Sequence, residues 1–116
     1  MLFRSRAVVA AIDRVCDAFL AIDADSGRVV DANPAAGALL GVARDALLDV
    51  DASAFIEAAA QANWSTALEA MTEGAELRRF PLTLRDASGA AIDVDCTATR
   101  FATRDRTLAL ILARPR

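Results

Sequence analysis

The sequence contains no histidine among its 116 residues. Histidine is the commonest general base in enzymes, the commonest zinc ligand in proteins and the usual proximal ligand of haem. Its absence excludes a haem held by histidine and leaves any acid–base or zinc chemistry to other side chains. We predict no catalytic residues and no metal site.

Cysteines and long apolar runs are also scarce. Cys16 and Cys96 lie in apolar patterns, which favours two buried reduced thiols over a disulfide or a metal pair. The longest apolar runs, 7–12 and 108–113, are six residues each, whereas a membrane-spanning helix needs roughly 20. The apolar stretch that follows the basic start ends at Asp13, too early for an export signal. We expect a cytoplasmic protein without a membrane partner.

The 13 basic residues are all arginine and are scattered, with no basic stripe interleaved with aromatic side chains. This pattern predicts no direct binding to nucleic acid. The sequence also lacks a phosphate-binding loop, a dinucleotide fingerprint and an activated nucleophile. Asp93 and Asp95 could form an acid or metal pair, but their alternation in a strand favours solvated carboxylates. We therefore expect no enzyme, although a small α+β enzyme using a buried carboxylate stays open.

Residues 1–17 contain a predicted amphipathic helix over 6–17. Its apolar side chains follow the spacing of one helical face, and we interpret that face as a dimer seam in preference to plain packing. With one residue of the last strand, the candidate seam consists of Val8, Ala11, Ile12, Val15 and Ile111.

The main body, 18–114, begins with a predicted hairpin. Strands over 19–22 and 28–32 flank a turn at Gly27, where Asp23 accepts turn amides. Asn33 then has the position of a helix N-cap, since Pro34 suits the first helical position and Gly41 is placed to end the helix. A second short helical piece is predicted over 43–49.

The segment 53–73 predicts two helices, because two apolar stripes of equal spacing fall on opposite faces. We place the break at 61–63, where Asn63 can cap the second helix, which Gly74 ends. Three alternating strands follow. Pro81 predicts an edge strand, and the doubly apolar last strand, 107–113, predicts a central position beside the first strand. The expected fold is α+β: a five-stranded antiparallel sheet with short helices on one face, in addition to the N-terminal helix.

These segments in this order resemble a PAS domain. The resemblance rests on FLAID, DSGRVVDAN, a helix ending ALLG and ARDALL in the first half, and on RDASGAAIDVDCTAT with a last strand in the second. It covers about residues 18–113. PAS domains are sensory and dimerisation modules of cytosolic signalling proteins, including two-component systems and transcription regulators. The resemblance implies a homodimer and an output domain on the same longer chain, such as a kinase, a cyclase or a DNA-binding unit.

Some PAS domains hold a flavin, haem or small metabolite between the helices and the sheet. In the light-sensing flavin subclass a reactive cysteine falls, by position, on Ala52 of this sequence. We therefore expect no cofactor of that kind, while a non-covalent flavin or a small apolar ligand stays open. Trp64 could stack on a flavin, although a core role is preferred for it. If the pocket is open, its expected lining is Leu20, Ile22, Leu40, Trp64, Leu68, Leu82, Val94 and Leu110.

Two functional hypotheses follow from this resemblance. In the first, the domain senses a small apolar ligand between sheet and helices, and occupancy changes how two copies meet. In the second, the leucine- and alanine-rich walls close on themselves, which leaves a structural homodimerisation domain without a ligand.

Overall fold

The computed structural model describes residues 17–116. The predicted helix over 6–17, the seam residues Val8, Ala11, Ile12 and Val15, and Cys16 lie outside these residues, apart from Asp17. The elements follow in the order β1 (Ala18–Asp23), β2 (Val29–Ala32), α2 (Pro34–Leu40), α3 (Arg44–Leu47), the 3₁₀ turns η1 (Ala52–Phe55) and η2 (Ala58–Ala60), α4 (Gln61–Thr72), β3 (Leu77–Arg85), β4 (Ala91–Ala102) and β5 (Thr107–Pro115).

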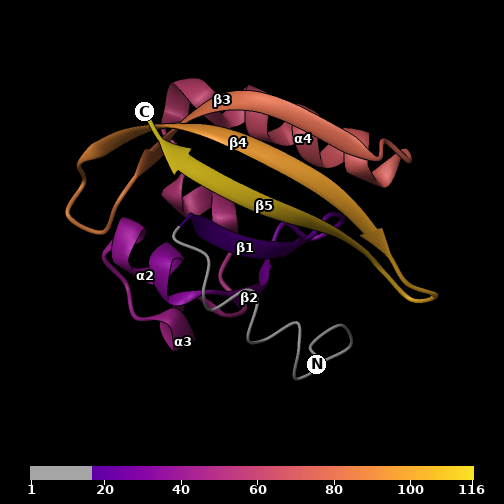
Figure 1. Ribbon diagram of the computed structural model, residues 1–116, viewed down its shortest axis with the longest axis horizontal. Helices are drawn as coiled ribbons and strands as arrows, with labels where there is room; N and C mark the ends of the chain where they lie inside the picture. The colour runs from indigo at the N-terminus through magenta and orange to yellow at the C-terminus, as the bar shows by residue number, and fades with distance from the viewer. Residues whose placement is uncertain (1–16) are drawn as a thin grey trace.

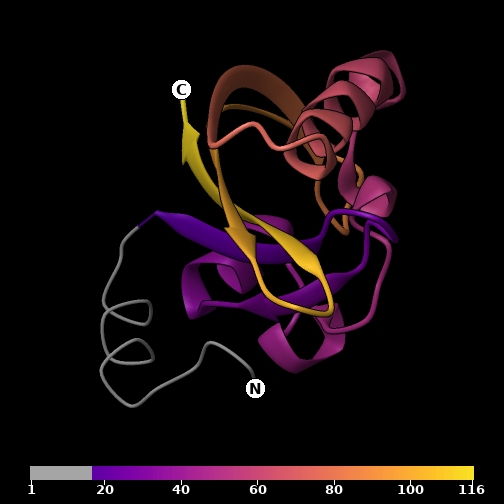
Figure 2. The same cartoon turned by 90° about the vertical axis from the view of Figure 1, so that its right-hand side faces the viewer.

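The strands form one five-stranded sheet in the order β2-β1-β5-β4-β3, with every pair antiparallel. The doubly apolar last strand, β5, lies in the centre beside β1, and the strand that contains Pro81 lies at the edge, as predicted. Figure 1 shows that the sheet is curved and that α4 runs along β3, while α2 and α3 lie beside β1 and β2. The view in Figure 2 separates these two groups of helices. The predicted α+β fold is therefore confirmed.

The segment between β1 and α2 folds by local chemistry. The Asp23 carboxylate accepts hydrogen bonds from the backbone N–H groups of Asp25 and Ser26, both at 3.0 Å, and Gly27 takes a positive φ of 75°.

Asn33 caps α2 by accepting a hydrogen bond from the Ala36 N–H, and Gly41 ends this helix in the left-handed conformation at φ 69°. Each of these features is as predicted.

The break between the two helical segments of 53–73 lies earlier than predicted. α4 already begins at Gln61, so Asn63 lies inside its first turn and caps nothing. The interruption occurs at Ile56 and Glu57, because Ile56 bridges Leu84 of β3 and the Glu57 N–H donates to the Thr83 carbonyl. This correction has a tertiary cause: pairing with a distant strand, which periodicity cannot detect, sets the break.

The C-terminal strands follow the expected hairpins. In the turn between β3 and β4, the Asp86 carboxylate accepts hydrogen bonds from the Ser88 hydroxyl at 2.6 Å and from the Ala90 and Ser88 N–H groups at 2.9 Å. These bonds, led by the one from the Ser88 hydroxyl, hold the pKa of Asp86 below its ordinary value. Thr103 and Arg106 close the next turn by a backbone hydrogen bond of 2.8 Å.

Candidate functional site

A small apolar cavity lies between the inner face of the sheet and the helical segments. Its volume is about 20 Å³. The polar groups among the lining side chains are the thiol of Cys96 and the indole N–H of Trp64. The lining residues are Leu20, Val29, Leu40, Leu47, Ala52, Phe55, Ile56, Trp64, Leu82, Leu84, Cys96, Ile111 and Ala113.

Half of the residues that the sequence predicts for this pocket line the cavity. They are Leu20, Leu40, Trp64 and Leu82. Ile22 and Val94 are fully buried in the same hydrophobic core but do not reach the cavity. Leu68 is half-buried against the core and lines a separate surface groove beside Asp25 and Glu69.

The two faces of β5 are assigned wrongly in the sequence prediction. Ile111, predicted for the dimer seam, is 2% exposed and lines the cavity, whereas Leu110, predicted for the pocket, does not. Leu110 pairs with Ala21 and Ile111 with Leu20, so the register places them on opposite faces. Alternation could not distinguish the faces, because the strand is apolar on both.

Nine lining residues escaped the sequence prediction. Leu84 and Cys96 have the strand parity of the predicted Leu82 and Val94, and this signal could have identified them. Ala52, Phe55 and Ile56 come from the irregular segment before α4, and no periodic pattern marks them. The residues not predicted are Val29, Leu47, Ala52, Phe55, Ile56, Leu84, Cys96, Ile111 and Ala113.

Among the groups that line the cavity, the Cys96 thiol is the candidate nucleophile. It is buried and not in a disulfide. Burial, with a smaller contribution from the charge of Asp95, raises its pKa to about 12. A thiol with this pKa stays protonated at neutral pH and is a poor nucleophile. The cavity therefore offers shape and apolar contact in place of covalent chemistry.

The cavity does not fit a flavin in this conformation. Pockets that hold organic ligands measure roughly 300–1,000 Å³, far above the 20 Å³ available here. Ala52, which takes the place of the reactive cysteine, does line the cavity and is 5% exposed. Trp64 is 4% exposed and belongs to the hydrophobic core, so its indole already packs against protein.

Asp31 is the buried carboxylate of the described residues, at 2% exposure. Its Oδ1 accepts hydrogen bonds from the Arg44 guanidinium and the Ala32 N–H, both at 2.9 Å, and Arg44 also donates to the Ala32 carbonyl. Buried charges are commonly neutralised by such pairing. The arrangement joins α3 to β2 and gives Asp31 a structural role.

Asn33, predicted as a structural cap, is completely buried and joins two segments. Its side-chain oxygen accepts hydrogen bonds from the N–H groups of Phe19 at 3.0 Å and Ala36 at 2.9 Å. Its amide nitrogen donates to the Asp17 carbonyl at 3.0 Å. Asn33 thus fixes the beginning of β1 to the beginning of α2.

The acidic pair of β4 lies apart from the cavity. Asp93 accepts a hydrogen bond from the Thr83 hydroxyl at 2.8 Å, and Asp95 faces Arg116 at 3.5 Å. Within residues 17–116, no group of three or more His, Cys, Asp or Glu side chains is arranged to hold a metal ion. In the same part of the chain, no helix combines the length and the apolar character needed to cross a membrane.

A family model and solved structures both support the fold. A family model described as "PAS domain" matches residues 17–114. A comparison with curated proteins found no match. Among solved structures, a domain of a sensory box sensor histidine kinase/response regulator from Geobacter sulfurreducens is 27% identical with a TM-score of 0.76, and the alignment covers 97% of this chain and 95% of that one.

Two further solved structures have the same fold. The PAS domain of nitrogen regulation protein NR(II) from Vibrio parahaemolyticus has a TM-score of 0.79 at 18% identity, over 97% of this chain and 100% of that one. The LOV protein of Rhodobacter sphaeroides has a TM-score of 0.75 at 20% identity, over 91% of this chain and 62% of that one. With the family model spanning nearly all described residues, this chain belongs to the PAS domain family.

Proposed function

We propose that this chain is a sensory and dimerisation module of a longer cytoplasmic signalling protein, and that its own side chains close its core. The observation that carries the closed core is the volume of the cavity, about 20 Å³. PAS domains are in general sensory modules, not enzymes, and the closed apolar core supports a signalling role without catalysis.

A cavity of this size has room for about one water-sized molecule, since such a molecule needs roughly 10–15 Å³. A resident flavin or haem would have to displace several buried lining side chains. The lining also offers no charged group, and its hydrogen-bonding side-chain groups are the Cys96 thiol and the Trp64 indole N–H. The domain is therefore expected to purify without a cofactor.

Sensing of a small apolar ligand is the second candidate function. The observation that favours it is the composition of the lining, to which β1, β3, β5, α2 and α4 all contribute. A guest that forces these walls apart would move the helices relative to the sheet. Because a ligand shifts an equilibrium only by its differential affinity for two states, the guest must bind the opened core more tightly.

Dimerisation is proposed to use the outer face of the sheet together with residues 6–17. The side chains on that face include Leu112, which is 37% exposed, and the half-buried Leu110. Ile111 is no longer part of the proposed seam, because it points into the core. An exposed apolar side chain on the sheet, together with an amphipathic helix predicted in the sequence before β1, fits a buried contact between two copies.

The output domain is proposed to lie elsewhere on the same longer chain. The solved PAS domains described above come from a sensor histidine kinase/response regulator and a nitrogen regulation protein. A kinase is therefore the first output domain to consider, followed by a cyclase or a DNA-binding unit. In either functional candidate, the domain would act by changing how two copies of the chain meet.

Native mass spectrometry and an absorption spectrum of freshly purified protein test the closed core. We expect the mass of the bare chain, 12.2 kDa per protomer, and no absorption in the visible range. A stoichiometric added mass would contradict the closed core and favour the ligand sensor. A flavin spectrum would contradict both the closed core and the fit argued from the lining.

Light scattering coupled to size exclusion tests the dimer. We expect the wild type to be dimeric, and Leu112→Asp and Ile12→Asp each to shift it toward monomer. Leu48→Asp serves as the matched control, because Leu48 has the same 37% exposure and follows α3. A monomeric wild type, or a dimer that both seam variants leave unchanged, would contradict the proposed interface.

A further inference from the structure

The free edge of the sheet at β3 has an open stretch. The direction of its backbone groups follows from two hydrogen bonds: the Arg100 N–H of β4 reaches the Glu76 carbonyl, whereas the Thr83 carbonyl accepts from Glu57, outside the sheet. The backbone N–H and carbonyl groups of even-numbered residues in β3 thus point toward β4, and those of odd-numbered residues point toward the free edge. Pro81 obeys the same rule, since its missing N–H falls on the free side.

The open stretch runs from Leu77 to Pro81. Toward the free edge it presents the N–H and carbonyl groups of Leu77 and Arg79 and the carbonyl of Pro81. Among residues 17–116, no backbone hydrogen bond reaches these groups from outside the sheet. Beyond this stretch the edge is closed, because Glu57 occupies the Thr83 carbonyl and Ile56 bridges Leu84. An added antiparallel strand would therefore have a defined place to begin.

The charge of the open stretch selects the partner. Arg78 and Arg79 are exposed, and neither forms an ion pair with an acidic side chain in the described part of the chain. A second copy paired antiparallel about the centre of the stretch would place Arg79 opposite its own equivalent. Like charges directly opposite each other destabilise a strand pair. An acidic segment would instead meet two unpaired guanidinium groups.

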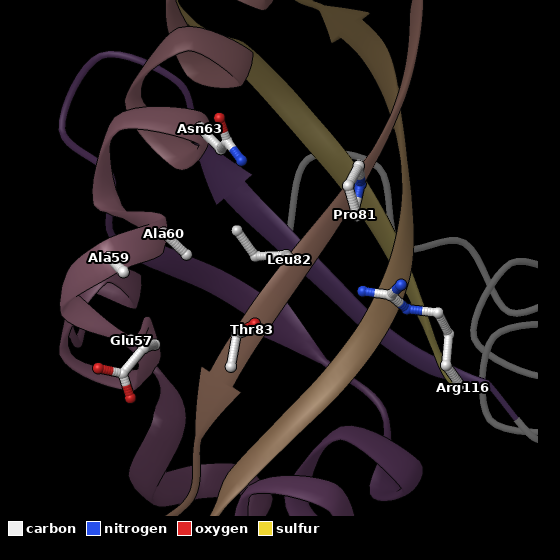
Figure 3. Close-up of a pocket in the computed structure, with 8 residues that line it drawn as sticks. All are labelled: Glu57, Ala59, Ala60, Asn63, Pro81, Leu82, Thr83 and Arg116. Atoms are coloured by element: carbon white, nitrogen blue, oxygen red, sulfur yellow. The ribbon is translucent and has the colours of Figure 1, made fainter.

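A groove of about 210 Å³ continues from the end of the open stretch. Figure 3 shows Ala59, Ala60 and Asn63 on one side of this groove and Pro81 and Leu82 of β3 on the other. The amide of Asn63 points toward Pro81 and is exposed. It can donate a hydrogen bond to a ligand at the position where Pro81 has no N–H to offer.

We propose that the Leu77–Pro81 edge of β3 binds an extended acidic segment of a partner protein by antiparallel strand addition. Backbone hydrogen bonds to Leu77 and Arg79 fix the register, Arg78 and Arg79 select for acidic side chains, and the groove at Asn63 receives the first residue of the added strand. Strand addition to an exposed sheet edge is a general mode of peptide recognition. This edge adjoins the outer sheet face proposed for dimerisation, since Arg79 lines a surface groove together with Leu112.

A blocked peptide whose central residues are two successive glutamates flanked by valines tests the proposal, with titration followed by NMR on the full chain. Successive strand residues point to opposite faces, so these glutamates can reach both Arg78 and Arg79. We expect saturable binding and slower exchange of the Leu77 and Arg79 amide hydrogens in the complex. The double variant Arg78→Gln/Arg79→Gln should weaken binding by about fivefold or more at low salt. Arg104→Gln, which removes an exposed arginine from the turn between β4 and β5, should leave binding unchanged.

Two further arms separate strand addition from attraction by charge alone. The same peptide with N-methylated backbone should bind about tenfold more weakly, because it lacks the donors for the Arg79 carbonyl. A lysine–valine peptide should not bind. The proposal is overturned if the acidic peptide fails to bind or if the Leu77 and Arg79 amides stay unprotected in its complex. It is also overturned if these amides become protected without peptide as the protein concentration rises, since the occupant is then a second copy.

Discussion

The guanidinium of Arg114 donates a hydrogen bond of 2.9 Å to the Asp17 carboxylate, 97 residues earlier in the chain. This contact joins the first residue that the structure describes to the end of β5. The hydrogen bond and the charge of Asp17 raise the pKa of Arg114. Since the Asp17 carbonyl also accepts from Asn33, the beginning of the domain, the end of β5 and the start of α2 form one connected unit.

The Asp17–Arg114 pair is expected to stabilise the fold weakly and in a salt-dependent way, because Arg114 is largely exposed. A double-mutant cycle with Asp17→Asn and Arg114→Gln, measured by urea unfolding, should give a small favourable coupling at low salt. The coupling should disappear at high salt. A coupling that high salt leaves intact would show that the pair acts through more than exposed charge.

Asn33→Ala should destabilise the domain by about 2–4 kcal/mol. The change removes the N-cap of α2 and leaves the buried N–H of Phe19 without its acceptor. Urea unfolding measures the loss. Asn63→Ala, in the exposed first turn of α4, is the control and should change stability by less than about 0.5 kcal/mol. Equal effects of the two variants would contradict the junction assigned to Asn33.

The two faces of β5 predict opposite sensitivities for neighbouring residues. Ile111→Ala should cost about 2–5 kcal/mol, because it enlarges a cavity among buried side chains. Leu112→Ala should cost much less in a sample dilute enough to be monomeric, since Leu112 is exposed on the opposite face. Thermal and urea unfolding compare them directly, and a larger loss for Leu112 would invert the assignment of the faces.

The raised pKa of Cys96 predicts that the folded domain becomes less stable at high pH. This pKa in the folded state is about 12, whereas the ordinary value is 9.0, so the unfolded chain loses the thiol proton first. The free energy of unfolding should fall as the pH rises from about 9 toward about 12. Urea unfolding in a Cys16→Ala background measures this slope, which Cys96→Ala should reduce.

The same Cys16→Ala background tests the burial of Cys96 by thiol labelling. An aromatic disulfide reagent at neutral pH should label Cys96 only as fast as the domain opens. Labelling at the rate of a free thiol would contradict the closed core.

Gly37→Ala should destabilise the domain although alanine is the better helix former. A Cβ at Gly37 would lie 2.7 Å from the Val42 carbonyl oxygen, a backbone atom that cannot move without shifting the connection to α3. We expect a loss of about 1–3 kcal/mol by urea unfolding. Ala38→Gly, in the exposed middle of α2, should lose about 1 kcal/mol through helix propensity alone. A stabilised Gly37→Ala variant would contradict the close approach.

The local chemistry of the chain made most of the fold predictable. Asn33, Pro34 and Gly41 define α2 by themselves. Gly27 marks the first turn, and the turn at Asp86 joins two strands of alternating pattern. Pro81 excludes a central position for β3 and is found at the edge. These features depend on residues within a few positions of one another, so the sequence contains all the physical information they need.

The tertiary structure alone decided which face of β5 points inward, where the helical segment before α4 breaks, and how much space the core leaves. Ile111 and Leu110 are equally apolar, so only the register with β1 distinguishes them. The break at Ile56 and Glu57 follows from contacts with Thr83 and Leu84 of β3. The size of the cavity is the small difference between the space enclosed by sheet and helices and the volume of side chains from all five strands, from α2, α3 and α4, and from the segment before α4. No local pattern contains this quantity.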